Sequence, residues 1–169
     1  MLDGASSYQH KDPTYPNGCH ICEVEVDKDT GNIDIVDYYA TDDFGKIINP
    51  LLVAGQVHGG IVQGLGQAMC EHAIYDDETG QLLNGSYMDY QMPRADDFPN
   101  FNIDFNEEAE CTTNLLGAKG CGEAGTVAST TAYVNAIINA LSDFDTQKLN
   151  MPITAQKVWG IINLSLIHI

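Results

Sequence analysis

A glycine-rich helical segment constrains the fold of this chain more than any other feature. Asn49 and Pro50 supply an N-cap followed by a proline at the first helical position, which is a typical helix start. Apolar residues then recur at helical spacing, and we predict a helix that runs to about Tyr75. The apolar face of this helix comprises Val53, Val57, Ile61, Leu65 and Met69.

The same segment contains the glycines Gly55, Gly59, Gly60, Gly64 and Gly66. Each interior glycine costs on the order of 1 kcal/mol relative to alanine, so a helix with this many glycines needs a compensating contact. Either a ligand approaches the helix backbone closely, or the helix packs tightly on a sheet. The segment alone leaves both interpretations open.

Upstream of this helix, residues 21–27 alternate between apolar and acidic side chains, as a half-buried strand requires. Turn-forming residues at 27–32 separate this strand from a second alternating stretch at 33–35. We therefore predict a β-hairpin. The inward-facing residues of its first strand are Cys22, Val24 and Val26.

Downstream, the pattern predicts a strand or extended segment at 86–91 and an alternating strand at 101–105. A second helix is expected over 126–142 and a last short helix over 154–162. We expect one α+β unit, in which a β-hairpin and mixed sheet pack with the glycine-rich helix and a C-terminal amphipathic helix. The apolar face of the second helix comprises Val127, Val134, Ile138 and Leu141.

A glycine-rich loop at 117–125 contains the main candidate for acid–base chemistry. It places Glu123 between glycines just ahead of a helix, where N–H groups and the positive end of the helix dipole point toward the loop. One interpretation is a glutamate that caps the helix. The other is a functional carboxylate, because the flanking glycines let the main chain pass close to a ligand.

Charge and cysteine content exclude several classes of protein. With 24 acidic and 7 basic residues, the net charge of −17 repels nucleic-acid phosphates. No apolar run approaches the roughly 20 residues that span a bilayer, and no export signal is recognisable, so we predict a cytoplasmic protein with reduced thiols. A metal-binding module is a further hypothesis, built on Cys19, His20 and Cys22, although no second pair of ligands follows.

Four short blocks of sequence, taken together and in their order along the chain, carry more information than any one of them. They read YPNGCH at 15–20, DDFG to NP at 42–50, GQVHGG to QGLGQ at 55–67, and GAKGCGE at 117–123. Together they resemble the large subunit of the xanthine dehydrogenase/aldehyde oxidase family of molybdenum hydroxylases. The resemblance is greatest to the branch that includes carbon monoxide dehydrogenase and bacterial aldehyde-oxidising enzymes.

This resemblance implies that residues 1–162 are part of the second molybdopterin-binding domain of a subunit several times longer. The chain is then a fragment, and we expect it to be inactive and aggregation-prone by itself. Residues 163–169 have no counterpart in the family pattern, and we expect them to be a non-native tail.

The resemblance also implies the roles of site residues. Glu123 falls on the family's catalytic glutamate, a general base toward water-derived oxygen at the metal, while hydride passes to the sulfido ligand. Gln56 matches a glutamine that contacts the molybdopterin. Gly120, Cys121 and Gly122 would border the cofactor, and we assign no residue of this chain as a metal ligand.

Among the remaining polar residues, we favour solvated side chains for Asp42 and Asp43 over a role in orienting backbone amides. Lys119 is either a ligand of a cofactor phosphate or a surface lysine. Gln63 and Gln67 are expected on a solvated helix face.

The reaction implied is the hydroxylation of an aldehyde, an N-heterocycle or a carbon monoxide-type substrate with oxygen from water. Its cofactor would be molybdenum-molybdopterin in the cytosine dinucleotide form, with iron–sulfur clusters and FAD on partner subunits in a dimer of heterotrimers. The rival hypothesis is a non-catalytic assembly or binding module, in which Glu123 only caps the helix.

Overall fold

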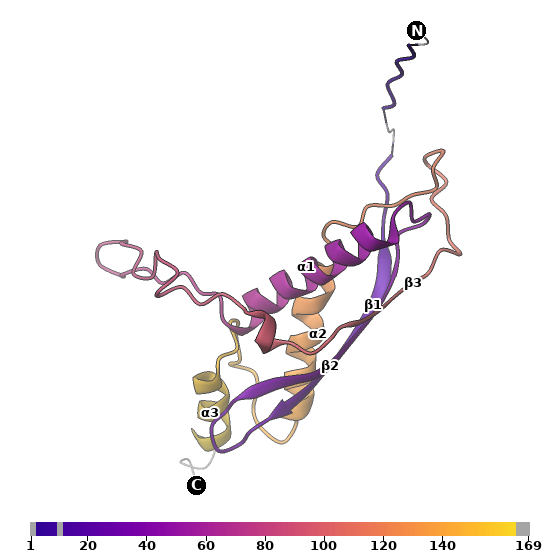
Figure 1. Ribbon diagram of the computed structural model, residues 1–169. Coiled ribbons are helices and arrows are strands. Elements are labelled where there is room, and N and C mark those ends of the chain that lie inside the picture. The colour runs from indigo at the N-terminus through magenta and orange to yellow at the C-terminus, as the bar shows by residue number, and fades with distance from the viewer. Residues whose placement is uncertain (1–2, 10–11, 165–169) are drawn as a thin grey trace.

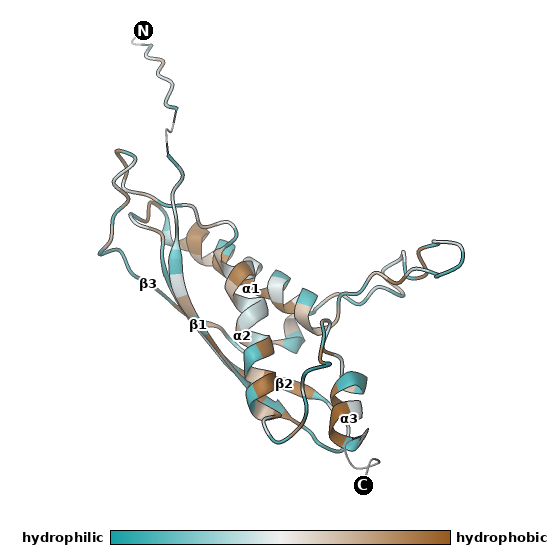
Figure 2. Cartoon of the chain, turned by 180° about the vertical axis from the view of Figure 1, so that it is seen from behind, coloured by the Kyte–Doolittle hydropathy of each residue, from teal (hydrophilic) through white to brown (hydrophobic). Residues whose placement is uncertain are grey.

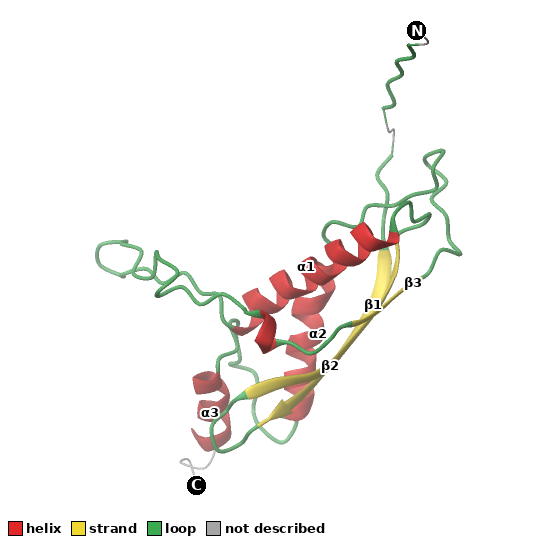
Figure 3. Ribbon diagram, in the orientation of Figure 1, coloured by secondary structure: helices red, strands yellow, loops and turns green. Residues whose placement is uncertain are grey.

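The computed structural model describes residues 3–9 and 12–164, which form a small mixed sheet covered by helices (Figure 1). A long arm at 70–94 leaves the helical side of the molecule, and loops make up most of the chain between 70 and 123 (Figure 3). The elements are β1 (Asn17–Val26), β2 (Ile33–Asp43), α1 (Pro50–Met69), the 3₁₀ helix η1 (Ala95–Asp97), β3 (Asn102–Phe105), α2 (Ala124–Ala140) and α3 (Ala155–Leu164).

The predicted hairpin and mixed sheet are confirmed. β1 pairs antiparallel with β2, β3 pairs parallel with β2, and the strand order is β1-β2-β3. β2 extends to Asp43, well beyond the predicted segment at 33–35. The register shifts between Glu23 and Val24, so that Val36 is an extra residue in β2. This bulge interrupts the alternation of the sequence and hides the second half of the strand from pattern analysis.

The apolar face predicted for α1 is confirmed, since Val57, Ile61 and Leu65 are fully buried. The helix ends at Met69, however, rather than near Tyr75. The backbone N–H groups of the two residues after it both donate to Gly66 O, which closes the helix.

The predictions for the segments that follow α1 have mixed outcomes. The strand at 101–105 is confirmed as β3, but 86–91 forms turns, in which the N–H groups of Asp89 and Tyr90 donate to Ser86 O. The predicted helix at 154–162 is confirmed as α3. Residues 163 and 164 end α3, and residues 165–169 of the predicted tail lie outside the described residues.

The second helix is confirmed as α2, but its predicted apolar face is wrong at Val127 and Ile138, whereas Val134 packs partly buried against the core. Val127 is 72% exposed and Ile138 is 41% exposed, whereas Leu141 is buried as predicted. Small residues lie at the contact with α1, and larger ones follow along the same face. The buried residues of α2 are Gly125, Ser129, Tyr133 and Ile137.

Two glycines of α1, Gly60 and Gly64, explain this packing, which is helix on helix rather than helix on sheet. Thr126 Oγ1 donates to Gly60 O at 2.9 Å, and Thr130 Oγ1 donates to Gly64 O at 3.1 Å. A Cβ on Gly64 would collide with Ser129. Gly60 and Gly64 therefore let α2 approach the backbone of α1, whereas a Cβ on Gly55 or Gly59 would meet no described atom within 4 Å.

Candidate functional site

The glycine-rich loop at 117–123 leads into the first turn of α2. Glu123 is the N-cap residue of α2, and its side chain is exposed. That side chain makes no capping hydrogen bond with the part of the chain that the structure describes. A capping glutamate would satisfy a free N–H group of the first helical turn. The capping interpretation thus lacks its hydrogen bond, and the carboxylate is left accessible.

Backbone contacts hold the start of this loop against the turn that follows β2. Gly45 and Ala118 form an antiparallel bridge, and Lys119 N donates to Phe44 O at 2.7 Å. The φ angles of Gly45 and Gly117 are 60° and 68°, a region that favours glycine. A Cβ on Gly45 would collide with the Gly117 carbonyl oxygen. The close approach of the two segments therefore requires these glycines.

A buried ion pair joins the same two segments. Lys119 Nζ lies 2.5 Å from Asp43 Oδ2, and Gly45 N donates to Asp43 Oδ1 at 2.7 Å. Burial raises the pKa of the Asp43 carboxyl, but the Lys119 and Gly45 hydrogen bonds, with the charge of Lys119, outweigh burial and hold that pKa below its ordinary value. The expectation that Asp43 is solvated is wrong. Its partner lies 76 residues away, which no local pattern reveals.

Asp42 is also buried rather than solvated, and it holds the opposite strand. Its two carboxylate oxygens lie 3.2 Å from His20 Nε2, and His20 Nδ1 lies 2.9 Å from the hydroxyl of Tyr38. Each ring nitrogen of His20 thus has a polar partner within hydrogen-bonding distance. These three buried side chains connect β1 to the C-terminal end of β2. The turn that contacts the glycine-rich loop follows directly after this end.

Gln56 is exposed on α1 beside the crossing with α2. A Cβ on Gly125 would come within 2.7 Å of Val57 O and Ile61 N, so the first turn of α2 lies directly on this part of α1. Gln56 precedes Val57, and Glu123 lies two residues before Gly125. The start of α2, which Glu123 precedes, therefore lies against the part of α1 that directly follows Gln56.

The backbone between Lys119 and Glu123 is open. Gly120 N donates to Thr14 Oγ1 at 3.1 Å, and a Cβ on Gly122 would meet no atom of the described chain within 4 Å. Cys121 is half-buried against the core. Accessible glycine backbone ahead of a helix N-terminus is a surface that suits phosphates and other anions. These residues, with the amide of Gln56, fit an organic cofactor that carries phosphate.

The remaining polar residues considered in the sequence have other surroundings. Gln63 and Gln67 are exposed, as predicted, and His58 packs beside Phe101 with ring centroids 5.8 Å apart. Among the described residues, no group of three or more His, Cys, Asp and Glu side chains is placed to hold a metal ion. None of the helices in the described ranges is long and apolar enough to cross a membrane.

The metal-module hypothesis also meets an obstacle in β1. Cys19 is exposed, whereas Cys22 is half-buried and packs against the core, so the two thiols lie on opposite faces of the strand. Both ring nitrogens of His20 are already engaged by Tyr38 and Asp42. A shared ion at these three residues would require β1 to be rebuilt.

Comparison with known proteins points to a single family. The family described as molybdopterin cofactor-binding domain matches residues 2–99. The nicotine 6-hydroxylase large subunit of Paenarthrobacter nicotinovorans is 38% identical over 96% of this chain. This chain spans only 20% of that relative's length.

Solved structures agree with the sequence comparison. A crystal structure of Cu,Mo-CO dehydrogenase superposes with a TM-score of 0.85 at 33% identity, over 95% of this chain and 20% of the other. Quinoline 2-oxidoreductase from Pseudomonas putida 86 superposes with a TM-score of 0.82 at 36% identity, over 88% of this chain and 19% of the other. The fold class and the resemblance seen in the four sequence blocks are confirmed.

Proposed function

This chain belongs to the molybdopterin cofactor-binding domain family, and from that premise we propose that it forms one side of the cofactor site in a molybdenum hydroxylase large subunit, with Glu123 as general base. The observation that carries the proposal is the setting of Glu123. Its carboxylate is accessible, makes no capping bond within the described chain, and follows backbone that is open to a ligand. Gln56 precedes Val57, on which the first turn of α2 packs, and its exposed side chain offers an amide donor and acceptor.

When bound, the molybdenum cofactor supplies the two-electron redox chemistry of the reaction. The chain's own residues hold and orient it. The N–H groups at the start of α2 and the backbone of Gly120, Cys121 and Gly122 would face the cofactor, and Gln56 would bind its pterin or phosphate part. Glu123 takes a proton from water as the oxygen of that water is transferred to the substrate.

The proposed substrate is an N-heterocycle, an aldehyde or a carbon monoxide-type molecule. Nicotine 6-hydroxylase and quinoline 2-oxidoreductase are both named for N-heterocyclic compounds, which puts this class first. We further propose the cytosine dinucleotide form of the cofactor, with iron–sulfur and flavin partner subunits in a dimer of heterotrimers. A relative named as subunit gamma of the 6-hydroxypseudooxynicotine dehydrogenase complex supports a multisubunit assembly.

The test is Glu123→Gln in the complete enzyme, because glutamine keeps the shape of the side chain and removes the base. We expect kcat to fall about 10²- to 10⁴-fold, the range of a lost general base, with unchanged molybdenum and pterin content. Glu108→Gln, at an exposed glutamate in a neighbouring loop, is the matched control and should leave kcat unchanged.

Near-wild-type turnover of the Glu123→Gln enzyme would remove the catalytic assignment. It would favour the rival hypothesis of an assembly module, for which the substitution alters only stability, by about 1 kcal/mol at a helix cap.

A further inference from the structure

Glu123 is held in place by contacts on either side of it rather than by its own side chain. Downstream, Gly125 is wedged against the backbone of α1 at Val57 and Ile61. Upstream, Lys119 contacts the end of β2 through both its backbone and its ammonium group. Between these points Gly120 N donates to Thr14 Oγ1 at 3.1 Å and Cys121 packs half-buried against the core, whereas a Cβ on Gly122 would meet no described atom within 4 Å. The position of Glu123 thus depends in part on how firmly Lys119 and Gly125 are held.

The ion pair of Asp43 and Lys119 has the properties of a fixed support. Their side chains are only 8% and 11% exposed, and the Nζ–Oδ2 distance is 2.5 Å. Both oxygens of Asp43 are used, one by Lys119 and the other by Gly45 N. A charge-assisted pair of this kind is short and strong, and loss of one partner would leave the other charge buried without compensation.

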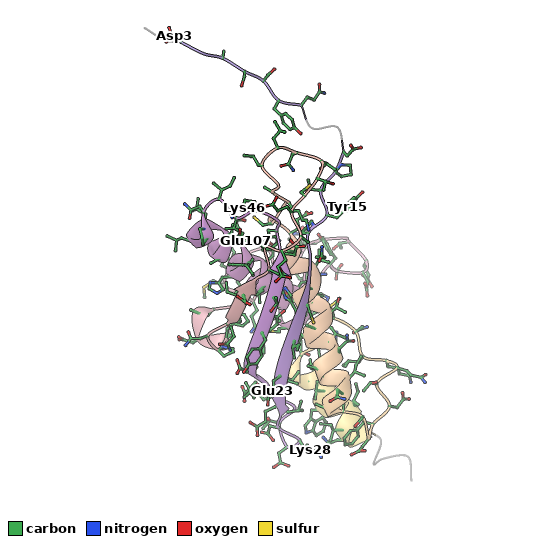
Figure 4. The ribbon with its side chains drawn as sticks, turned by 90° about the vertical axis from the view of Figure 1, so that its right-hand side faces the viewer. Asp3, Tyr15, Glu23, Lys28, Lys46 and Glu107 are labelled. Atoms are coloured by element: carbon green, nitrogen blue, oxygen red, sulfur yellow. The ribbon has the colours of Figure 1, made fainter. Side chains whose placement is uncertain are left out.

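The ion pair of Lys46 and Glu107 is exposed and serves as a comparison for the buried pair of Asp43 and Lys119. Lys46 Nζ lies 3.1 Å from Glu107 Oε2, but these side chains are 57% and 43% exposed. Figure 4 shows the two labelled residues side by side near the end of the strands that lies toward Tyr15. Exposed pairs contribute little to stability because water and salt screen them. Lys46 therefore provides a matched control.

We propose that the Asp43–Lys119 ion pair is a positioning device that fixes the upstream end of the loop and thereby sets where the Glu123 carboxylate stands. The proposal rests on the function proposed for Glu123. Lys119 and Asp43 act through that residue and are positioning residues, not catalytic ones. The device couples the sheet to the loop, since Asp43 ends β2 while its neighbour Asp42 binds His20 of β1.

The experiment compares Lys119→Met, Lys119→Arg, Lys46→Met and Glu123→Gln in the complete enzyme. Three quantities are measured: molybdenum content, kcat and KM, and amide hydrogen exchange of residues 117–123. Lys119→Met should speed exchange in 120–123 and lower kcat about 10- to 100-fold, as a small misplacement of a catalytic group does, with KM and molybdenum content near wild type. Lys119→Arg should restore most of kcat, and Lys46→Met should change none of these quantities.

The positioning role would be overturned if Lys119→Met had the amide exchange and the kcat of the wild type. It would also be overturned if kcat fell only in proportion to a loss of molybdenum. If Lys119→Met does not fold, the double variant Asp43→Asn with Lys119→Met leaves no unpaired buried charge and is judged by the same criteria. Failure of the proposed function shows separately, as unchanged kcat in Glu123→Gln. Failure of this inference shows as unchanged exchange and kcat at Lys119 while Glu123→Gln is inactive.

Discussion

At the scale of single residues, three thiols have different electrostatic settings. Burial raises the pKa of Cys22 to about 12 and that of Cys70 to about 11, with the carboxylates of Glu71 and Asp97 adding to the effect at Cys70. In contrast, hydrogen bonds from the side chain and then the backbone of Thr113 lower the pKa of Cys111. Because the thiolate is the nucleophile, these shifts order the reactivity of the three cysteines.

We predict that iodoacetamide at pH 8 modifies Cys111 before Cys22 and Cys70 in the folded chain. A thiol with a raised pKa remains protonated at this pH, whereas a lowered pKa increases the thiolate fraction. Mass spectrometry of peptides from a time course gives the order, and the same reaction in denaturant should abolish it. Equal rates for Cys111 and either buried thiol in the folded chain would contradict these assignments.

The same scale shows which residues could be predicted from the sequence. The motif resemblance singled out Glu123 and Gln56, and their roles stay predictions; the first turn of α2 lies on α1 at Val57 and Ile61. Asp43 was not accessible, because a carboxylate next to a turn looks solvated until its partner is known. That partner, Lys119, is brought to it only by the folded chain, 76 residues away.

At the scale of elements, the contact between α1 and α2 depends on glycine. We predict that Gly125→Ala destabilises the chain by about 1–3 kcal/mol, the usual cost of overpacking, because its Cβ would come within 2.7 Å of Val57 O and Ile61 N. Gly59→Ala is the matched control, since no described atom lies within 4 Å of its Cβ position. It should gain up to about 1 kcal/mol of helix propensity.

Urea denaturation of the wild-type protein, Gly125→Ala and Gly59→Ala measures these changes in the free energy of unfolding. Opposite signs for Gly125→Ala and Gly59→Ala would support the packing described here. A neutral or stabilising effect of Gly125→Ala would show that the two helices are farther apart than the structure places them.

Helix and strand patterns were predictable where large apolar residues mark the buried face. Val57, Ile61 and Leu65 marked α1 correctly. The range of α2 was also predicted, but part of its buried face was not, because small residues such as Gly125 and Ser129 form its contact with α1 and leave Val127 exposed. Apolar periodicity gives no signal for a face whose burial depends on close backbone approach.

At the scale of the whole molecule, apolar side chains remain exposed around the site. Apolar residues of α1 and of the arm are coloured brown in Figure 2, and several large apolar side chains of the chain are exposed. Exposed apolar side chains that gather on a surface mark contact with other protein, and the chain spans about a fifth of the relatives it matches. Under the proposed function, we expect these side chains to contact other parts of a large subunit. The exposed residues nearest the start of α1, the loop and α2 are Ile48, Leu51, Leu52, Leu115, Leu116 and Val127.

The most direct test of the central claim is the molybdenum and pterin-nucleotide content of the native complex, captured from its source through an epitope in residues 20–120. Elemental analysis and mass spectrometry should find about one molybdenum and one pterin nucleotide per copy of this chain, as cofactor-dependent catalysis requires. A complex that contains this chain but neither molybdenum nor pterin would contradict the account, and Glu123 would then have no cofactor to serve.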